Sequence, residues 1–289
     1  MAAVLLAALA GASFGALAVA VRWGLRGGGD PEAGALGAAV VASAASLIVA
    51  APSAAVDGVD AGALWPFFAA GLIAPGVSQI VLTLAVRNAG PSRAAIFMGT
   101  GPLISILIAL TILDEPFRPL LVVATVLVVL GGIALAGERR RPDHFRVLGA
   151  VLALLCAVLF AIRDNVVRWA ARTDHPPPLV AAATSLLAAA ALIFVYVVLL
   201  RRDRLRAFPR PAALAFGPAG LALALGYDAL LAAFDRGRVS IVAPLNATGA
   251  LWAVVLSTVV IGRSEMIGRR TVAAGVLIVS GGALIGGVR

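Results

Sequence analysis

Hydrophobic residues fill the chain in long runs that are separated by short polar stretches. A run of about 20 apolar residues, wound as an α-helix, is long enough to cross the roughly 30 Å hydrocarbon core of a membrane. The runs lack the alternation of apolar and polar positions that is typical of membrane β-strands, and no linker is long enough for a soluble domain. The pattern predicts an all-α integral membrane protein with ten transmembrane helices. The predicted spans are residues 2–21, 31–51, 64–86, 92–113, 119–136, 147–167, 178–200, 212–234, 239–261 and 271–287.

The second half of the sequence repeats the first with a shift of 146 to 150 residues. Rare residues carry this match, so a composition rich in alanine, leucine and glycine does not explain it. We predict two five-helix repeats, residues 1–141 and residues 142–289. The aligned pairs include Phe14 with Phe160, Arg22 with Arg168, Trp23 with Trp169, Arg26 with Arg172, Pro31 with Pro177, Ser92 with Ser240, Thr100 with Thr248 and Glu115 with Glu265.

Five spans in each repeat have a topological consequence. A unit with an odd number of spans ends on the opposite side of the membrane from where it began, so its copy must be inserted upside down. Inverted repeats recur in secondary transporters, whose substrate site lies near the membrane midplane at the repeat interface. The alternative is that the duplication only provides a simple way to make a large membrane protein.

Composition agrees with the membrane assignment, because 62% of the residues are hydrophobic and the mean hydropathy is +1.04. A net charge of +9 would suggest nucleic acid in a soluble protein. Here the basic residues lie in loops between spans and act as topology signals, so we expect no nucleic-acid partner. Cys156 is the single cysteine and falls within an apolar span, which excludes an intrachain disulfide. His144 and His175 lie in loops without neighbouring ligands, so no metal site and no cofactor are predicted.

Residues 85–115 closely resemble the helix 3 to helix 4 signature of the EamA type within the drug/metabolite transporter superfamily. That signature has a short glycine-containing loop, a serine that opens helix 4, a proline within the helix and a glutamate thirteen residues later. Ser92, Pro102 and Glu115 occupy these places. The resemblance covers the whole chain and implies a multi-pass transporter in the cell (inner or plasma) membrane with a small-molecule substrate.

The second repeat departs from this signature at several positions. Ser240 is present, but Ala250 stands where the proline is expected, Pro244 comes six residues earlier and Glu265 comes two residues late. These departures leave open whether the two halves bend at equivalent points. Both glutamates of the signature fall near helix ends, where a structural role in capping and orienting the next helix is expected.

Asp228 is the best candidate for a functional charged residue. A charged side chain inside a membrane costs roughly 2.5 to 3.5 kcal/mol on insertion scales, and such residues often mark transport pathways. Asp228 lies within the eighth predicted span, in the sequence Gly-Tyr-Asp-Ala-Leu-Leu. We hypothesise that it binds and releases a proton as substrate moves. The alternative is that it lies at the membrane interface, where it is hydrated or paired.

Arg163, Asp164 and Asn165 form a second polar cluster, near the end of the sixth predicted span. Arg163 is expected to face Asp164 or Asp228 across a shared cavity. The simpler explanation is an interfacial ion pair between Asp164 and Arg168, which are four residues apart on one helix. The first repeat has no charged residue at the positions equivalent to Arg163, Asp164 and Asp228, so the expected cavity is polar mainly on its second-repeat wall.

Aromatic and amide side chains within the spans are candidates for the cavity lining, although packing is the commoner role of an aromatic residue or a methionine on an apolar helix. Thr100 and Thr248 are expected to bond to their own backbone near Pro102 and Pro244, which would ease a bend at each proline. The lining candidates are Phe14, Gln79, Met98, Phe160, Tyr227, Asn246 and Trp252.

Orientation and function class keep alternatives at this stage. Most of the arginines fall in loops on the side opposite the termini, which places both termini outside, whereas the resemblance implies both termini in the cytoplasm. The leading function is a proton-linked secondary transporter, an exporter or exchanger of a small organic metabolite, amino acid or drug-like compound, that works in the lipid bilayer as a monomer or a homodimer. Its rivals are a non-transporting scaffold or channel subunit and a membrane-embedded enzyme acting on lipid.

Overall fold

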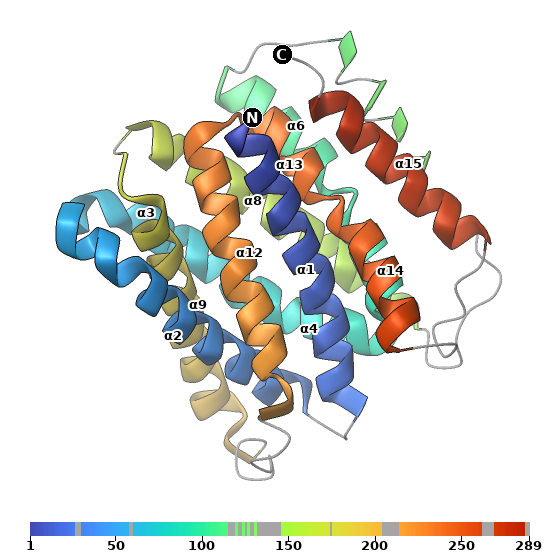
Figure 1. The fold of residues 1–289 in the computed structure, drawn as a ribbon. Coiled ribbons are helices and arrows are strands. Elements are labelled where there is room, and N and C mark those ends of the chain that lie inside the picture. The colour runs from blue at the N-terminus through green and yellow to red at the C-terminus, as the bar shows by residue number, and fades with distance from the viewer. Residues whose placement is uncertain are drawn as a thin grey trace.

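The computed structural model describes residues 1–26, 30–57, 60–114, 146–173, 175–203, 214–261 and 269–286, with scattered positions between 119 and 131. These residues form a bundle of helices (Figure 1). α1 lies between α12 and α14, while α2 packs against α9 and α12. The helices are α1 (Ala2–Arg26), α2 (Pro31–Asp57), α3 (Ala61–Gly71), η1 (Leu72–Val77), α4 (Ser78–Ala89), α5 (Pro91–Met98), α6 (Gly101–Ile112), α8 (Val147–Thr173), α9 (Pro178–Leu200), α12 (Gly217–Arg236), α13 (Val239–Asn246), α14 (Gly249–Val260) and α15 (Arg269–Gly286).

Eight helical stretches of the described chain are long and apolar enough to cross a membrane. They coincide with the first four predicted spans and with the sixth to the ninth, and α15 covers the tenth. The fifth predicted span, residues 119–136, falls largely outside the described residues, so the all-α membrane fold is established and the number ten stays a prediction. The eight stretches are Ala2–Arg26, Pro31–Val56, Ala61–Ala89, Pro91–Ile112, Val147–Thr173, Pro178–Leu200, Gly217–Arg236 and Val239–Val260.

Local sequence signals set where several of these helices begin. Proline is the first residue of α2, α5 and α9, a position where the missing amide hydrogen would have no partner within the helix. Asp30 accepts hydrogen bonds from the amides of Glu32 and Ala33 at the start of α2, both at 3.0 Å. Asp60 caps α3 in the same way through the amide of Gly62.

Repeat-related helices run antiparallel to each other, as inverted repeats require. The continuous stretch of α5 and α6 aligns in sequence with that of α13 and α14. Ser92, at the start of α5, contacts Ser257 near the end of α14. At the other end of the pair, Ile241 of α13 packs with Ile106 and Leu110 of α6. The two stretches therefore cross with opposite directions, and their contacts enclose the middle of the bundle from two sides.

Small residues let α1 approach the α13–α14 pair closely. A Cβ atom added at Gly11 would lie 2.8 Å from the carbonyl oxygen of Asn246, and one at Gly15 would lie 2.6 Å from the carbonyl oxygen of Gly249. The spacing of four residues between Gly11 and Gly15 places both glycines on the face of α1 that packs against these helices. In the other repeat, Gly101 of α6 lies against Ala157 of α8, the sequence equivalent of Gly11.

Gly15→Leu is expected to destabilise the bundle, because the new Cβ would clash with backbone atoms of α14, which cannot move as a flexible side chain could. The free energy of unfolding should fall by about 1–3 kcal/mol or more, measured by thermal unfolding in detergent. Gly217→Leu is the matched control, since a Cβ at Gly217 meets no atom within 4 Å. Equal stability of the two variants would contradict the proposed close contact.

Candidate functional site

A cavity of about 80 Å³ lies where α1, α4, α5, α8, α13 and α14 meet. Both repeats contribute to its wall, and both interrupted helices reach it. Phe14 and Phe160, which are equivalent in the two repeats, line it from α1 and α8. The complete lining is Phe14, Leu17, Leu82, Ala95, Met98, Gly99, Phe160, Arg163, Asn246, Ala247, Gly249 and Ala250.

The two helix interruptions at the cavity fall at equivalent positions. α5 ends at Met98 and α6 begins at Gly101, while α13 ends at Asn246 and α14 begins at Gly249, so a shift of 148 residues superimposes both breaks. The missing proline at Ala250 therefore does not displace the second break. Sequence reasoning left this equivalence open, because it considered proline alone as the cause of a bend.

Hydrogen bonds to the residue three positions back replace part of the α-helical pattern at each break. The amide of Thr100 donates to the carbonyl of Phe97 at 3.2 Å, and the amide of Thr248 donates to the carbonyl of Leu245 at 3.1 Å. The hydroxyl of each threonine donates to the same carbonyl oxygen, at 2.7 Å in both cases. The predicted backbone bonding of the two threonines is confirmed, and it satisfies polar groups where the helix is irregular.

Arg163 is the one ionisable residue on the cavity wall, and its side chain is 98% buried. Its guanidinium carbon lies 5.0 Å from the ring centre of Tyr227 and 5.3 Å from that of Phe160, within the range of cation–π attraction. Tyr227 in turn packs edge-on against Phe14 at 5.9 Å. Rings from α8 and α12 therefore hold the guanidinium in place, and Phe14 of α1 supports the second of them.

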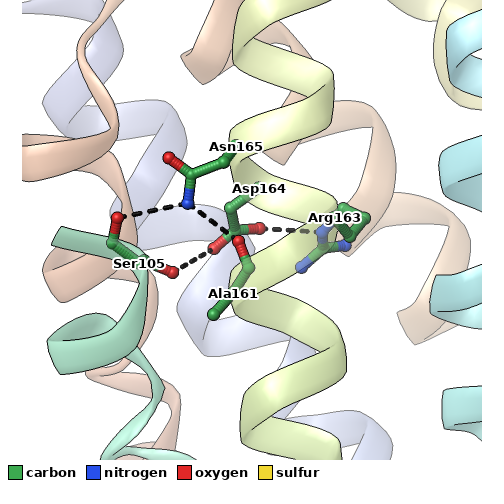
Figure 2. A network of polar contacts seen from close by, with 5 residues as sticks. All are labelled: Ser105, Ala161, Arg163, Asp164 and Asn165. Carbon is green, nitrogen blue, oxygen red and sulfur yellow. Dashed lines mark hydrogen bonds and ion pairs between the residues drawn. The ribbon is translucent and has the colours of Figure 1, made fainter. Parts of the chain in front are cut away.

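Asp164 pairs with Arg163 and connects it to α6 (Figure 2). The Nε atom of Arg163 donates to Oδ1 of Asp164 at 2.7 Å. The Ser105 hydroxyl donates a long hydrogen bond of 3.5 Å to Oδ2 of Asp164. The Asn165 amide donates to the carbonyls of Ser105 and Ala161, at 3.1 Å and 2.8 Å. Because the Asp164 carboxylate is almost fully buried, this network provides the compensation that a charge inside a membrane requires.

The expected pairing of Asp164 with Arg168 is wrong. Arg168 instead donates from Nη1 to the carbonyl oxygen of Phe234, at 2.7 Å, and so joins α8 to the end of α12. Asp164 faces α6 and the adjacent guanidinium. The helical spacing of four residues favoured a surface pair between Asp164 and Arg168. The Asp164 carboxylate is buried, however, and it pairs instead with Arg163, which is buried beside it.

Asp228 lies apart from the cavity wall, on the side of α12 that contacts α2. Its Oδ1 atom accepts a hydrogen bond from the hydroxyl of Ser46 at 2.5 Å, and the residue is 9% exposed. Asp228 forms no ion pair with any residue in the described part of the chain. The expected shared cavity with Arg163 is thus absent from this conformation, although Tyr227, the residue before Asp228, contacts the arginine.

Comparison with known proteins agrees with this architecture. The EamA-like transporter family matches residues 1–136 and again residues 147–287. The chain belongs to the EamA-like transporter family. A crystal structure of another protein superimposes with a TM-score of 0.70 over 98% of this chain and 96% of that chain, at 23% sequence identity, which supports the shared fold. No curated protein matched the sequence.

Two equivalent arginines connect helices at the ends of this EamA-type bundle. Nη2 of Arg26 donates to the carbonyl of Ile261 at 2.9 Å, and Nη1 of Arg172 donates to the carbonyl of Leu113 at 3.2 Å. Arg26 and Arg172 align between the repeats, as do the two acceptor residues. Each arginine thereby ties the end of α1 or α8 to the end of the broken helix beside it.

The remaining predicted residues of the EamA chain occupy varied positions. Gln79 is buried in α4, outside the cavity lining, and its Nε2 atom has no hydrogen bond. Trp252 is 42% exposed and lies outside the cavity lining. Pro102 is in the first turn of α6 and Ser240 is buried in α13. Glu115 and Glu265 lie outside the described residues.

Sequence reasoning missed the small residues and serines that complete this EamA-type site. Ser46 and Ser105 bind the two buried carboxylates, but serines are common in apolar helices and neither lies near a charged residue in the sequence. Gly99 and Gly249 line the cavity at the breaks. Their position on either side of Thr100 and Thr248 was the available signal, since glycine next to a threonine favours an irregular helix.

The buried Arg163–Asp164 pair should behave as one unit in stability measurements. Arg163→Gln and Asp164→Asn alone are each expected to lower the free energy of unfolding by about 3–5 kcal/mol, because each leaves an uncompensated buried charge. The double variant should lose much less than the two single losses combined. Thermal unfolding in detergent measures all three.

The Arg236–Asp235 pair provides the control for this comparison. It also joins neighbouring residues, at 3.4 Å, but its side chains are 47% and 30% exposed. Arg236→Gln should change stability by less than about 1 kcal/mol. Additive losses at Arg163 and Asp164 would show that the two charges do not compensate each other.

Proposed function

We propose that this protein is a secondary transporter that moves a small organic solute through the cavity between its two repeats by alternating access. The observation that carries the proposal is the cavity at the crossing of two broken, antiparallel and repeat-related helices. Interrupted helices are tolerated at membrane depth where they line a cavity, and in transporters such breaks form substrate sites. The family assignment supports the same function.

The cavity is closed down in this conformation. Its volume of about 80 Å³ has room for a few water molecules, whereas organic ligands generally occupy sites of roughly 300–1,000 Å³. Transport of an organic solute therefore requires the walls to separate on one side at a time. The α5–α6 and α13–α14 stretches contact each other at both ends of their crossing, so breaking the contacts at one end would open the cavity on that side alone.

The two ends of that crossing are closed by different chemistry. On one side, the hydroxyls of Ser92 and Ser257 contact each other at 2.5 Å, close to the Arg26 bond to α14. On the other side, Ile241 packs with Ile106 and Leu110, and Arg172 donates to the carbonyl of Leu113 at the end of α6. The serine contact and the isoleucine–leucine packing therefore distinguish the two closures, while an arginine bond is common to both.

Asp228 is our candidate for proton coupling. It is a carboxylate inside an apolar bundle, and it accepts a hydrogen bond from a neutral hydroxyl, that of Ser46. A carboxylate without a fixed positive partner can become neutral by taking up a proton when water leaves it. Because Asp228 follows Tyr227, which touches both Arg163 and Phe14, movement of α12 during transport would change the surroundings of the carboxylate and of the cavity together.

A transported solute should stabilise the purified protein and should also exchange across a membrane. At a solute concentration a hundredfold above its dissociation constant, the free energy of unfolding should rise by about 2.7 kcal/mol. The measurement is thermal unfolding against a panel of organic anions, cations and zwitterions, followed by counterflow in proteoliposomes for each stabilising compound. A non-transporting scaffold predicts no counterflow for any of them.

Asp228→Asn is expected to remove the pH dependence of transport while leaving the protein folded. The amide oxygen can still accept the Ser46 hydrogen bond, but the amide cannot bind and release a proton. In proteoliposomes, an imposed pH gradient should alter the initial rate of the wild type and leave that of the variant unchanged. Asp60→Asn is the control, since Asp60 is an exposed cap of α3 and asparagine also caps helices. A variant that keeps the wild-type pH response removes Asp228 from the coupling step.

A further inference from the structure

Arg163 leaves one of its hydrogen-bond donors unused at the cavity. Asp164 engages Nε, and the two aromatic rings cover the guanidinium, but Nη1 is buried and forms no hydrogen bond. The Tyr227 ring lies beside the guanidinium, and its hydroxyl is also buried without a hydrogen bond among the described residues. An unsatisfied donor of a buried charged group is unfavourable, so an acceptor that enters the cavity would gain from binding to it.

We propose that the cavity binds an organic monocarboxylate with an apolar body, and that the carboxylate accepts a hydrogen bond from the guanidinium of Arg163. This inference rests on the proposed transport function and names the class of substrate. Arg163 is the single ionisable group among the lining residues of the cavity. The local charge that faces a ligand is therefore positive, because Asp164 approaches the arginine from outside the cavity lining.

The helix ends at the breaks add a smaller charge than the guanidinium carries. The C-terminal ends of α5 and α13 reach the cavity, and so does the N-terminal end of α14. Two partial negative ends and one partial positive end, each about half a charge, leave a partial negative sum that is smaller than the full charge of the guanidinium. The sign at the site is set by the guanidinium, which favours an anion over a cation.

A single negative charge matches the site better than a phosphate group. Phosphates carry close to two charges at neutral pH and are usually held by several cationic groups or backbone amides. Here one arginine faces the cavity, and its charge is already shared with Asp164. A carboxylate adds one charge and can use the donor that Asp164 leaves unoccupied.

The remainder of the wall is suited to an apolar body. Phe14 and Phe160 lie on α1 and α8, and Leu17, Leu82 and Met98 add further apolar surface. The other polar side chain is Asn246, whose Oδ1 atom is also buried without a hydrogen bond. Its repeat equivalent is Met98, so the polar groups of the wall are concentrated in the second repeat, where they would orient an asymmetric ligand.

Benzoate, benzamide and benzylamine provide a matched series to test the proposal, because they share a ring and differ in the charge of the polar group. Binding is measured by thermal stabilisation and by titration calorimetry on the full-length protein in detergent. Benzoate should bind about 10- to 100-fold more tightly than benzamide, the range expected for a hydrogen bond to a charged group. Benzylamine should bind more weakly than either. Equal binding of benzoate and benzamide, or tighter binding of benzylamine, would overturn the proposal.

Variants at Arg163 connect the preference to this residue. Arg163→Lys keeps the charge, and the double variant Arg163→Gln with Asp164→Asn removes both charges and so avoids a lone buried carboxylate. Both should fold, and the double variant should lose the preference for benzoate over benzamide. Arg87→Gln, at the exposed end of α4, is the control for removal of one arginine and should bind benzoate as the wild type does. A double variant that is folded and keeps the preference would overturn the proposal.

Failure of this inference can be told apart from failure of the proposed function. If benzoate shows no advantage but another solute undergoes counterflow in proteoliposomes, the protein is a transporter and the carboxylate assignment is wrong. If benzoate binds through Arg163 but neither it nor any other carboxylate undergoes counterflow, the site is correct and transport is wrong. Phenylalanine carries both an aromatic carboxylate side and an ammonium group, so it tests whether Asn246 accepts a hydrogen bond from the ligand. If Asn246→Leu weakens the binding of phenylalanine but not that of benzoate, the assigned orientation is supported. If the variant loses binding of both compounds, the orientation is contradicted.

Discussion

Lipid offers no hydrogen bonds to a backbone amide or carbonyl, and this constraint decides where the helices of this protein can be interrupted. Each of the two interruptions at the cavity lies inside the bundle, at a point where small residues allow close contact with the neighbouring helix. Thr100 and Thr248 satisfy part of the freed backbone through their hydroxyls. The cavity exists because both irregular segments must be placed where protein, and not lipid, surrounds them.

The same constraint explains why the two repeats differ where they do. The framework residues that fix helix breaks and close contacts serve both copies equally, so they recur at a constant shift. A charged group is needed on one side of a cavity only, and a second copy would add a further cost of burial. Arg163 and Asp164 therefore replace Leu17 and Ala18 of the first repeat without disturbing the shared backbone.

Much of the fold was predictable because membrane spans depend on composition over about twenty residues, and the repeat was visible in rare residues. Helix ends were less accessible: α1 reaches Arg26 and α8 reaches Thr173, several residues beyond the apolar runs. Long arginine side chains extend such helices because they can bond to carbonyls of neighbouring helices, as Arg26 and Arg172 do. The sequence also did not reveal which partner each buried carboxylate has, since Ser46 and Ser105 lie on distant segments.

The arrangement of Arg163 and Asp164 lowers the cost of placing a charged group on the wall of a buried cavity. A guanidinium without a counter-charge would be too costly to keep buried, whereas one fully satisfied by a carboxylate would have nothing to offer a ligand. Asp164 approaches the arginine through Nε, and Ser105 helps to hold the carboxylate toward α6. The charge is thus compensated while part of the guanidinium keeps no hydrogen-bond partner among the described residues. Because Asn165 also anchors α8 to the backbone of α6, the residues around Arg163 are joined directly to one of the two helices that are interrupted at the cavity.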